Sequence, residues 1–177
     1  MGRGVVILTA LVSLLAVTSP AEARTFGDPD DVASRLDLQY VSFARTGTGD
    51  RASLRFRATT YDDWTIRQCL HAATLEDGCT IRFVLDTVGT KAWRPTGRGV
   101  DYNLVWHPKS CVLIDPTSLS AEGVGVATKD DRSVTCSIRR NKLTIHKKIR
   151  WYADTTWANV QTQVYASDLA PNRGWYG

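Results

Sequence analysis

The chain has 177 residues, of which 43% are hydrophobic and 23% are charged, and its formal net charge at pH 7 is +4. This balance is typical of a globular protein and excludes a collagen-like or charge-rich disordered chain. The modest positive charge is scattered along the sequence, so it predicts a solvated surface, and it disfavours nucleic acid as a partner.

Residues 1–23 have the pattern of a secretory signal peptide. Arg3 gives a positive start, residues 5–17 form an apolar run of 13, and residues 21–23 (Ala-Glu-Ala) are a small-x-small cleavage site. The apolar run is shorter than the roughly 20 residues that a membrane-spanning helix needs. No transmembrane segment is expected in the mature chain. We therefore expect secretion, with residues 24–177 forming a single extracellular domain.

Four cysteines, an even number in an exported chain, predict two disulfides. We favour Cys69–Cys79, which closes a short loop with the turn-like sequence Glu-Asp-Gly, and Cys111–Cys136, which joins two strand-like segments. A zinc site is the rival interpretation, but the chain has no Cys-x-x-Cys spacing.

Apolar and polar side chains alternate through most of the mature sequence. Leu54, Phe56 and Ala58, for example, alternate with serine, arginine and threonine. This period of two marks a strand with one buried face, and turn-rich segments separate the candidate strands. The strands expected on this basis are 36–45, 51–59, 81–86, 102–107, 111–114, 123–128, 134–139, 143–146 and 149–157.

These eight or nine strands predict an all-β fold, with two antiparallel sheets packed face to face. Our first choice is a disulfide-stapled antiparallel β-sandwich of jelly-roll type, and a closed barrel is the second. Residues 30–34 are compatible with one helical turn, and residues 160–170 fit either helix or strand. The tail at 170–177 has two aromatic residues that we expect to pin it to the domain.

Several short motifs are shared with a known group of proteins. The chain opens with Asp-Pro-x-Asp at 28–31 and Leu-Asp at 36–37, continues with Phe-x-Leu-Asp-Thr-x-Gly at 83–89 and Asp-Tyr at 101–102, and ends with Asp-x-Ala-Pro-Asn-x-Gly-Trp at 168–175. It therefore resembles secreted, mostly uncharacterised β-sandwich domains of high-GC Gram-positive bacteria. The resemblance covers nearly all of the mature chain and implies secretion and a β-sandwich, but no activity.

Many domains of this kind have Asp-Thr-Asp-Gly-Asp-Gly after the central strand, a loop rich in oxygen ligands for calcium. The present chain departs from that pattern, because residues 86–91 keep only the first carboxylate and end in Lys91. Calcium is therefore disfavoured at this loop. Asp86 and Asp101 are expected to form salt bridges with nearby arginines instead.

No residue pattern predicts catalysis. Asp62 and Asp63 beside Trp64 suggest a pair of glycosidase carboxylates, but adjacent residues of a strand point to opposite faces. The histidines lack metal-binding spacing, and no nucleophile motif is present. We therefore expect no enzyme, no metal site and no cofactor.

Aromatic residues outside the strands are the strongest indication of binding. Trp64, Trp93 and Trp175, with Arg94, lie in turn-rich or terminal segments, where exposed rings stack on sugars or anchor a partner protein. The alternative is that these rings plug the open ends of the domain. The remaining tryptophans are expected in the core: Trp106, Trp151 and Trp157.

Three functional classes follow. We favour a secreted, non-catalytic interaction or structural module whose partner is a cell-surface polysaccharide or another extracellular protein. A carbohydrate-binding module that uses the rim tryptophans is the first alternative. An extracellular hydrolase whose acidic residues converge only in the folded chain is the second.

Overall fold

The computed structural model describes residues 22–70, 77–94, 100–146, 148–159 and 164–177. Most of the predicted signal peptide lies outside the described residues. Cleavage after residue 23 would leave all but two residues of the first strand in the mature chain. None of the helices in the described ranges has the length and hydropathy needed to cross a membrane.

Strands make up most of the described chain, and the few helices are short. In chain order the described elements are β1 (Glu22–Gly27), β2 (Leu38–Thr46), η1 (Gly49–Arg51), β3 (Ser53–Thr60), α1 (Ile66–Leu70), β4 (Asp77–Asp86), β5 (Tyr102–His107), β6 (Ser110–Asp115), β7 (Ser120–Lys129), β8 (Ser133–Arg139), η3 (Arg140–Lys142), β9 (Arg150–Asn159) and β10 (Val164–Ala170).

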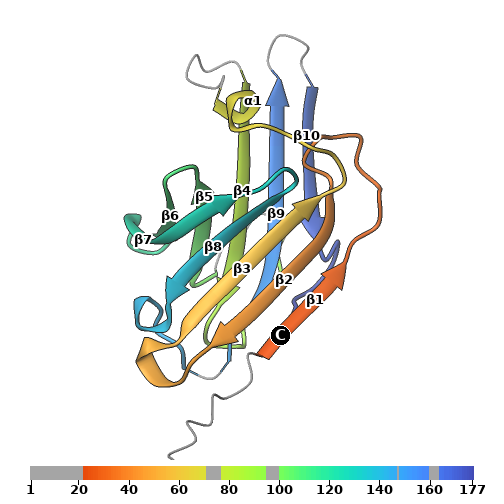
Figure 1. Ribbon diagram of the computed structural model, residues 1–177. Coiled ribbons are helices and arrows are strands. Elements are labelled where there is room, and N and C mark those ends of the chain that lie inside the picture. The colour runs from red at the N-terminus through yellow and green to blue at the C-terminus, as the bar shows by residue number, and fades with distance from the viewer. Residues whose placement is uncertain (1–21, 71–76, 95–99, 147, 160–163) are drawn as a thin grey trace, which may run out of the picture.

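The ten strands form one antiparallel sheet in the order β1-β2-β3-β8-β7-β6-β5-β4-β9-β10. The sheet curls over itself, so that β2, β3 and β8 face β4 and β9, and β10 comes to lie near β2 (Figure 1). The predicted all-β, antiparallel, disulfide-stapled fold is confirmed. Facing halves of one nearly closed sheet take the place of two separate sheets, and β1 and β10 are its two edges.

The predicted disulfides Cys69–Cys79 and Cys111–Cys136 are both present. The second joins β6 to β8, which lie on either side of β7 and would be about 10 Å apart in a flat sheet. The Cα atoms of Cys111 and Cys136 are only 5.7 Å apart. The sheet therefore folds sharply at β7, where the register with β6 also shifts.

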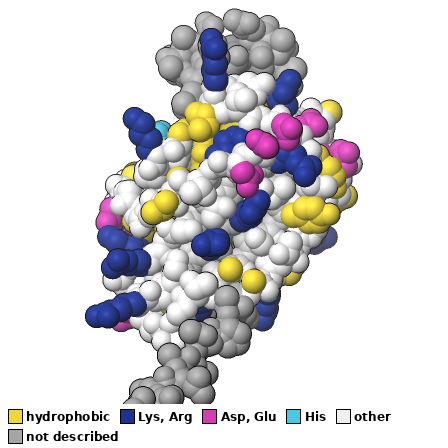
Figure 2. Space-filling model, in the orientation of Figure 1, with side chains coloured by type: hydrophobic (Ala, Val, Ile, Leu, Met, Phe, Trp, Pro, Cys, Tyr) yellow, Lys and Arg dark blue, Asp and Glu magenta, His cyan; other side chains and the backbone are white. Residues whose placement is uncertain are grey.

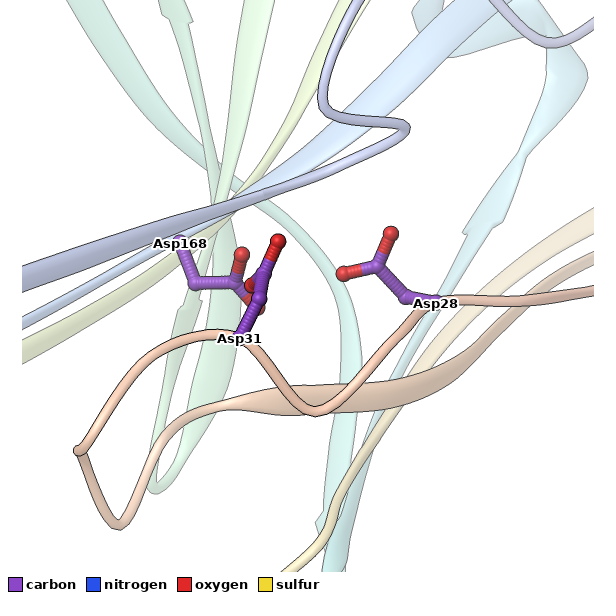
Figure 3. Close-up of side chains that lie close together, drawn as sticks. All are labelled: Asp28, Asp31 and Asp168. Atoms are coloured by element: carbon purple, nitrogen blue, oxygen red, sulfur yellow. The ribbon is translucent and has the colours of Figure 1, made fainter.

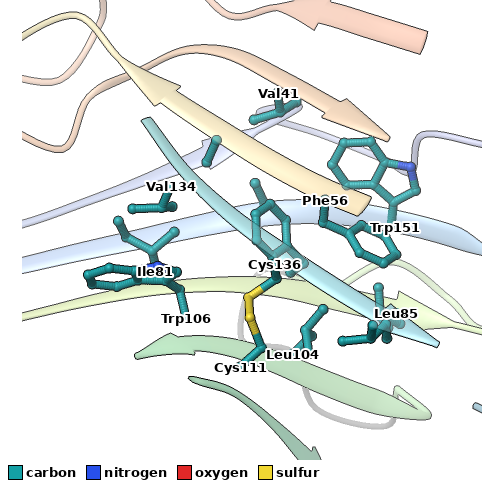
Figure 4. Packing of buried hydrophobic residues seen from close by; sticks show 14 of the residues in the cluster. Val41, Phe56, Ile81, Leu85, Leu104, Trp106, Cys111, Val134, Cys136 and Trp151 are labelled. Carbon is teal, nitrogen blue, oxygen red and sulfur yellow. A yellow bond between two sulfur atoms is a disulfide. The ribbon is translucent and has the colours of Figure 1, made fainter. Parts of the chain in front are cut away.

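The core fills the space between the two halves of the curled sheet (Figure 4). The alternating residues of β3, β4 and β8 supply much of it, as predicted. Phe56 packs against both Phe83 and Trp151, with ring centroids 5.5 and 5.8 Å apart. Trp106 and Trp151 lie in this core as expected, while Trp157 is half-buried at its border.

A second, smaller cluster covers the outer face of β4 and β9. Val84 and Tyr152 are its buried members on the strands, and the C-terminal tail packs over them through Trp175. The following residue, Tyr176, forms two backbone hydrogen bonds with Trp151, of 2.9 and 2.8 Å. The tail aromatics therefore pin it to the domain, as predicted.

Two expected elements differ. Residues 143–146 follow η3 as an irregular segment rather than a strand, and residues 30–34 form a bent segment rather than a helix. The strands at 22–27 and 164–170 complete the sheet at its two edges.

Candidate functional site

Trp64, one of the predicted binding residues, lies in the core. Only 2% of it is exposed, and its ring meets that of Trp106 edge-on at 5.7 Å. The ammonium group of Lys129 covers the ring at 4.2 Å. Trp64 therefore has no exposed ring face on which a sugar could stack, and it belongs to the hydrophobic core instead.

Trp93, Arg94 and Trp175 come together around Tyr152 on the outer face of β9. The rings of Trp93 and Trp175 lie 6.3 and 5.2 Å from that of Tyr152, both at steep angles. The Tyr152 hydroxyl donates to the carbonyl of Arg94 at 2.7 Å. Both tryptophans are half-buried, so much of each ring is used to cover the cluster below.

Asp86 and Asp101, on either side of the loop after β4, both pair with protein cations, but only Asp86 pairs with an arginine, as predicted, whereas the partner of Asp101 is a lysine. Arg150 pairs with Asp86, and Lys91 Nζ lies 3.6 Å from Asp101 Oδ1. Asp101 also accepts the backbone N–H of Thr87 at 2.7 Å.

A cavity of about 330 Å³ opens at the end of the sheet where β1, β3 and β9 begin and β2 ends. Six of its lining residues are apolar and four are basic, and none of the described lining residues is acidic. The apolar residues are Phe26, Phe43, Leu54, Ile145, Ile149 and Trp151. The basic residues are Arg24, Arg45, Arg140 and Lys148.

Charge at this cavity is only partly balanced by nearby groups. Arg140 donates to Asp50 at 2.9 Å, and Lys148 Nζ donates to a main-chain oxygen of Gly177, the last residue, at 3.4 Å. Arg45 is exposed at the end of β2. Volumes of this size hold small ligands, and the mixture of rings with cations suits an anion that has an apolar body.

Acidic side chains gather where the two edges of the sheet approach each other. Asp28 follows β1, Asp31 lies in the next loop, and Asp168 belongs to β10. One carboxylate oxygen from each lies within 4.8 Å of those from the other two. Figure 3 shows these three carboxyl groups converging from the two edges, and we call them the seam cluster.

The seam cluster is partly enclosed. Asp28 is 8% exposed and Asp168 is 3% exposed, whereas Asp31 faces solvent. Asp168 accepts the N–H groups of Leu38 and Leu169 at 2.6 and 2.7 Å. Asp31 accepts the Asn172 amide at 2.6 Å.

Burial and mutual repulsion perturb these carboxyl groups. Burial, followed by the charges of Asp168, Asp31 and Asp37, raises the pKa of Asp28 to about 7. Burial, followed by a hydrogen bond with Asp30 and the charge of Asp168, raises the pKa of Asp37 to about 7 as well. Each of these two carboxyl groups therefore holds its proton more readily than an exposed aspartate does, because burial and neighbouring carboxylates disfavour its charged form.

Figure 2 shows that the acidic side chains of this face gather at the upper right, with basic side chains both among them and over the rest of the face. A hollow of about 310 Å³ lies beside the seam and is lined by Asp30, Asp37 and Tyr61 among others. Neither Asp28 nor Asp168 lines it.

Sequence reasoning missed both the basic cavity and the seam cluster. The aspartates at 28 and 31 stood in a recognised motif, but their partner at 168 follows some 140 residues later. Only the closure of the sheet brings these segments together.

Comparison with known proteins found no matching family model, no matching curated protein and no matching solved structure. The resemblance to secreted domains of high-GC Gram-positive bacteria stays a prediction.

Proposed function

We propose that the protein is a secreted, non-catalytic binding module that takes an amphipathic anion into the basic cavity. The observation that carries this proposal is the composition of the cavity wall, in which four cations, three of them exposed, are combined with six aromatic and aliphatic side chains. Secretion is supported by the export signal pattern and by two disulfides, which persist in oxidising compartments.

The cavity wall favours a ligand with two parts. Phe26, Phe43 and Ile149 are half-buried in the cavity wall, so they keep an apolar surface that an acyl chain or aromatic ring would cover. Covering such a surface contributes about 25 cal/mol per Å² of apolar area removed from water. The cations around the opening attract a carboxylate, sulfate or phosphate group.

A binding role also fits the acidic residues better than hydrolysis does. A hydrolase needs two carboxylates that reach the substrate. Asp28 and Asp168 face each other, but both are buried away from the neighbouring hollow. The carbohydrate-binding alternative loses Trp64, which lies in the core, and keeps only the half-buried Trp93 and Trp175.

Titration with anilinonaphthalene sulfonate, a fluorescent aromatic anion, tests this proposal. We expect saturable binding, competition by dodecanoate, and little competition by dodecyltrimethylammonium, which has the same chain with the opposite charge. Added salt should weaken the dodecanoate interaction, because exposed charges are screened.

Variants locate the binding. Arg45→Gln removes an exposed cation at the cavity and should weaken dodecanoate about fivefold, or about 1 kcal/mol. Arg55→Gln is the matched control, since Arg55 lies on the opposite face of β3 from Leu54. Equal binding of both surfactants, or equal losses in the two variants, would contradict the proposal.

A further inference from the structure

We propose that the seam cluster, Asp28, Asp31 and Asp168, binds a calcium ion that joins the two edges of the curled sheet. The proposal concerns a site separate from the basic cavity and does not depend on the ligand proposed there.

Geometry is the first support. Calcium binds oxygen at 2.3–2.6 Å, so two ligands on opposite sides of one ion lie at most about 5 Å apart. The three carboxylate oxygens of the seam cluster lie within 4.8 Å of one another. One ion can therefore contact all three without a large movement of the backbone.

The second support is an unsatisfied buried oxygen. Asp28 is 8% exposed, and its Oδ2 atom has no hydrogen-bond partner among the described residues. Figure 3 shows its carboxyl group directed toward those of Asp31 and Asp168. A buried carboxylate oxygen without a partner is costly, and a cation at the centre of the cluster would satisfy it.

Other buried carboxylates of this protein have cations of their own. Asp86 pairs with Arg150, and Asp154 pairs with Arg82. In contrast, no ion pair within the described ranges involves a member of the seam cluster. The fold thus neutralises its buried acids elsewhere with arginine and leaves the seam for another cation.

Donor chemistry selects calcium. The ligands are all oxygens, which favours a hard cation over zinc or copper. Asp28 and Asp168 are buried, whereas Asp31 is exposed and lies beside the Asn172 amide. The other coordination positions of the ion are therefore open to water or to an amide oxygen. Calcium tolerates such an irregular mixed set, whereas magnesium demands near-octahedral geometry.

The position of the ion gives it a structural role. β1 and β10 do not pair with each other, and they are the two ends of the strand order. Asp168 of β10 already accepts the N–H of Leu38 at the start of β2. A calcium ion held by Asp28, Asp31 and Asp168 adds a second link across the same seam.

Calorimetry and thermal unfolding of the purified, EDTA-treated protein test the site with CaCl₂ alone. We expect one binding site with a Kd of about 10⁻⁴–10⁻³ M, the range of extracellular calcium modules. About 10 mM CaCl₂ should raise Tm by about 3–10 °C relative to EDTA, because binding to the folded state alone stabilises it. MgCl₂ should have a much smaller effect.

Variants make the assignment specific. Asp31→Asn changes an exposed residue, so it should fold normally and lose most of the calcium effect on Tm. Asp28→Asn should match or exceed the parent Tm in EDTA, since it removes a buried charge, and should fall below the parent in CaCl₂. Asp62→Asn, an exposed aspartate close to the seam but outside the cluster, is the matched control and should respond to calcium like the parent.

Three results would overturn the proposal. The first is the absence of saturable calcium binding together with equal Tm values in CaCl₂ and EDTA. The second is a calcium effect of full size in both Asp28→Asn and Asp31→Asn. The third is an equal response to MgCl₂, which would show a general effect of divalent salt.

Discussion

One buried carboxylate, Asp86, organises the loop that follows β4. It accepts the backbone N–H groups of Gly89 and Lys91 at 2.7 and 3.1 Å and pairs with Arg150. Arg150 also donates to the carbonyl of Lys91 at 2.7 Å and lies 5.4 Å from the centre of the Trp175 ring. Asp86 and its partner Arg150 therefore connect the end of β4, the loop that follows it and the C-terminal tail.

This arrangement predicts how stability depends on pH. Burial raises the pKa of Asp86, but hydrogen bonds from Arg150 and from the Gly89 and Lys91 amides outweigh burial, so the pKa lies below its usual value. The ionised carboxylate then stabilises the folded state above the unfolded pKa of about 3.9, and this contribution is lost as pH falls through the lower folded pKa.

The Asp86→Asn variant should lose about 3–5 kcal/mol of unfolding free energy at pH 7, because it leaves the Arg150 charge without its partner. The difference from the parent should shrink toward pH 3. Urea denaturation at several pH values measures both effects. Asp50→Asn breaks the exposed pair with Arg140 and should cost about 1 kcal/mol or less. A difference that does not change with pH would contradict this account.

At the scale of elements, the fold of the sheet at β7 depends on glycine. A Cβ atom on Gly125 would lie 2.7 Å from Ile138 Cγ2 and closer still to the Ser137 carbonyl oxygen. Gly125 is opposite both Cys111 of β6 and Ile138 of β8. The absence of a side chain thus lets the neighbouring strands approach where the disulfide joins them.

Replacing Gly125 by a larger residue should destabilise the folded protein. Gly125→Ala forces backbone and side-chain shifts in β8, and we expect it to lower the free energy of unfolding by about 1–3 kcal/mol or more. Gly123→Ala is a matched control two residues earlier in the same strand, where a Cβ atom meets nothing within 4 Å. Urea denaturation should show at most a small change for the control. Equal effects at both positions would mean that the close approach at Gly125 is unimportant.

The elements also show what alternation can predict. The sequence predicts a strand at 102–107, and β5 has the same bounds. A period of two runs through all six positions, and turn-forming residues flank them. Residues 143–146 have the same alternation but form no strand. They follow β8, whose two edges already pair with β3 and β7, so no free edge is available there.

The seam cluster and the basic cavity were harder to predict, because alternation locates strands but does not tell which strands come to face each other. Both disulfides and an ion pair between Asp86 and an arginine could be predicted from local sequence, since these depend on strands that the alternation located. The seam cluster and the basic cavity depend on how far the sheet curls, which is a property of the whole chain. Trp64 illustrates the limit, because its turn-rich surroundings suggested exposure while the sheet encloses it.

At the scale of the whole molecule, the two edges of the sheet are joined by the C-terminal tail as well as by the seam residues. The ring of Tyr176 stacks on that of Phe26 from β1, with centroids 4.0 Å apart and an angle of 16° between the planes. Its backbone pairs with Trp151 of β9. Tyr176 therefore links the edge strand β1 to β9, the neighbour of the other edge strand β10, beside the basic cavity that Phe26 and Trp151 both line.

This bridge predicts that the tail contributes to global stability. Tyr176→Ala removes the ring stack and should lower the free energy of unfolding by about 1–3 kcal/mol, with a reduced signal from anilinonaphthalene sulfonate because the cavity wall loosens. Tyr176→Phe keeps the ring and should retain most of the stability. Tyr165→Ala is the matched control, since that tyrosine is 75% exposed on β10 and should cost less than about 0.5 kcal/mol. If Tyr176→Ala unfolds at the same urea concentration as Tyr165→Ala, the tail lies against the domain without holding its edges together.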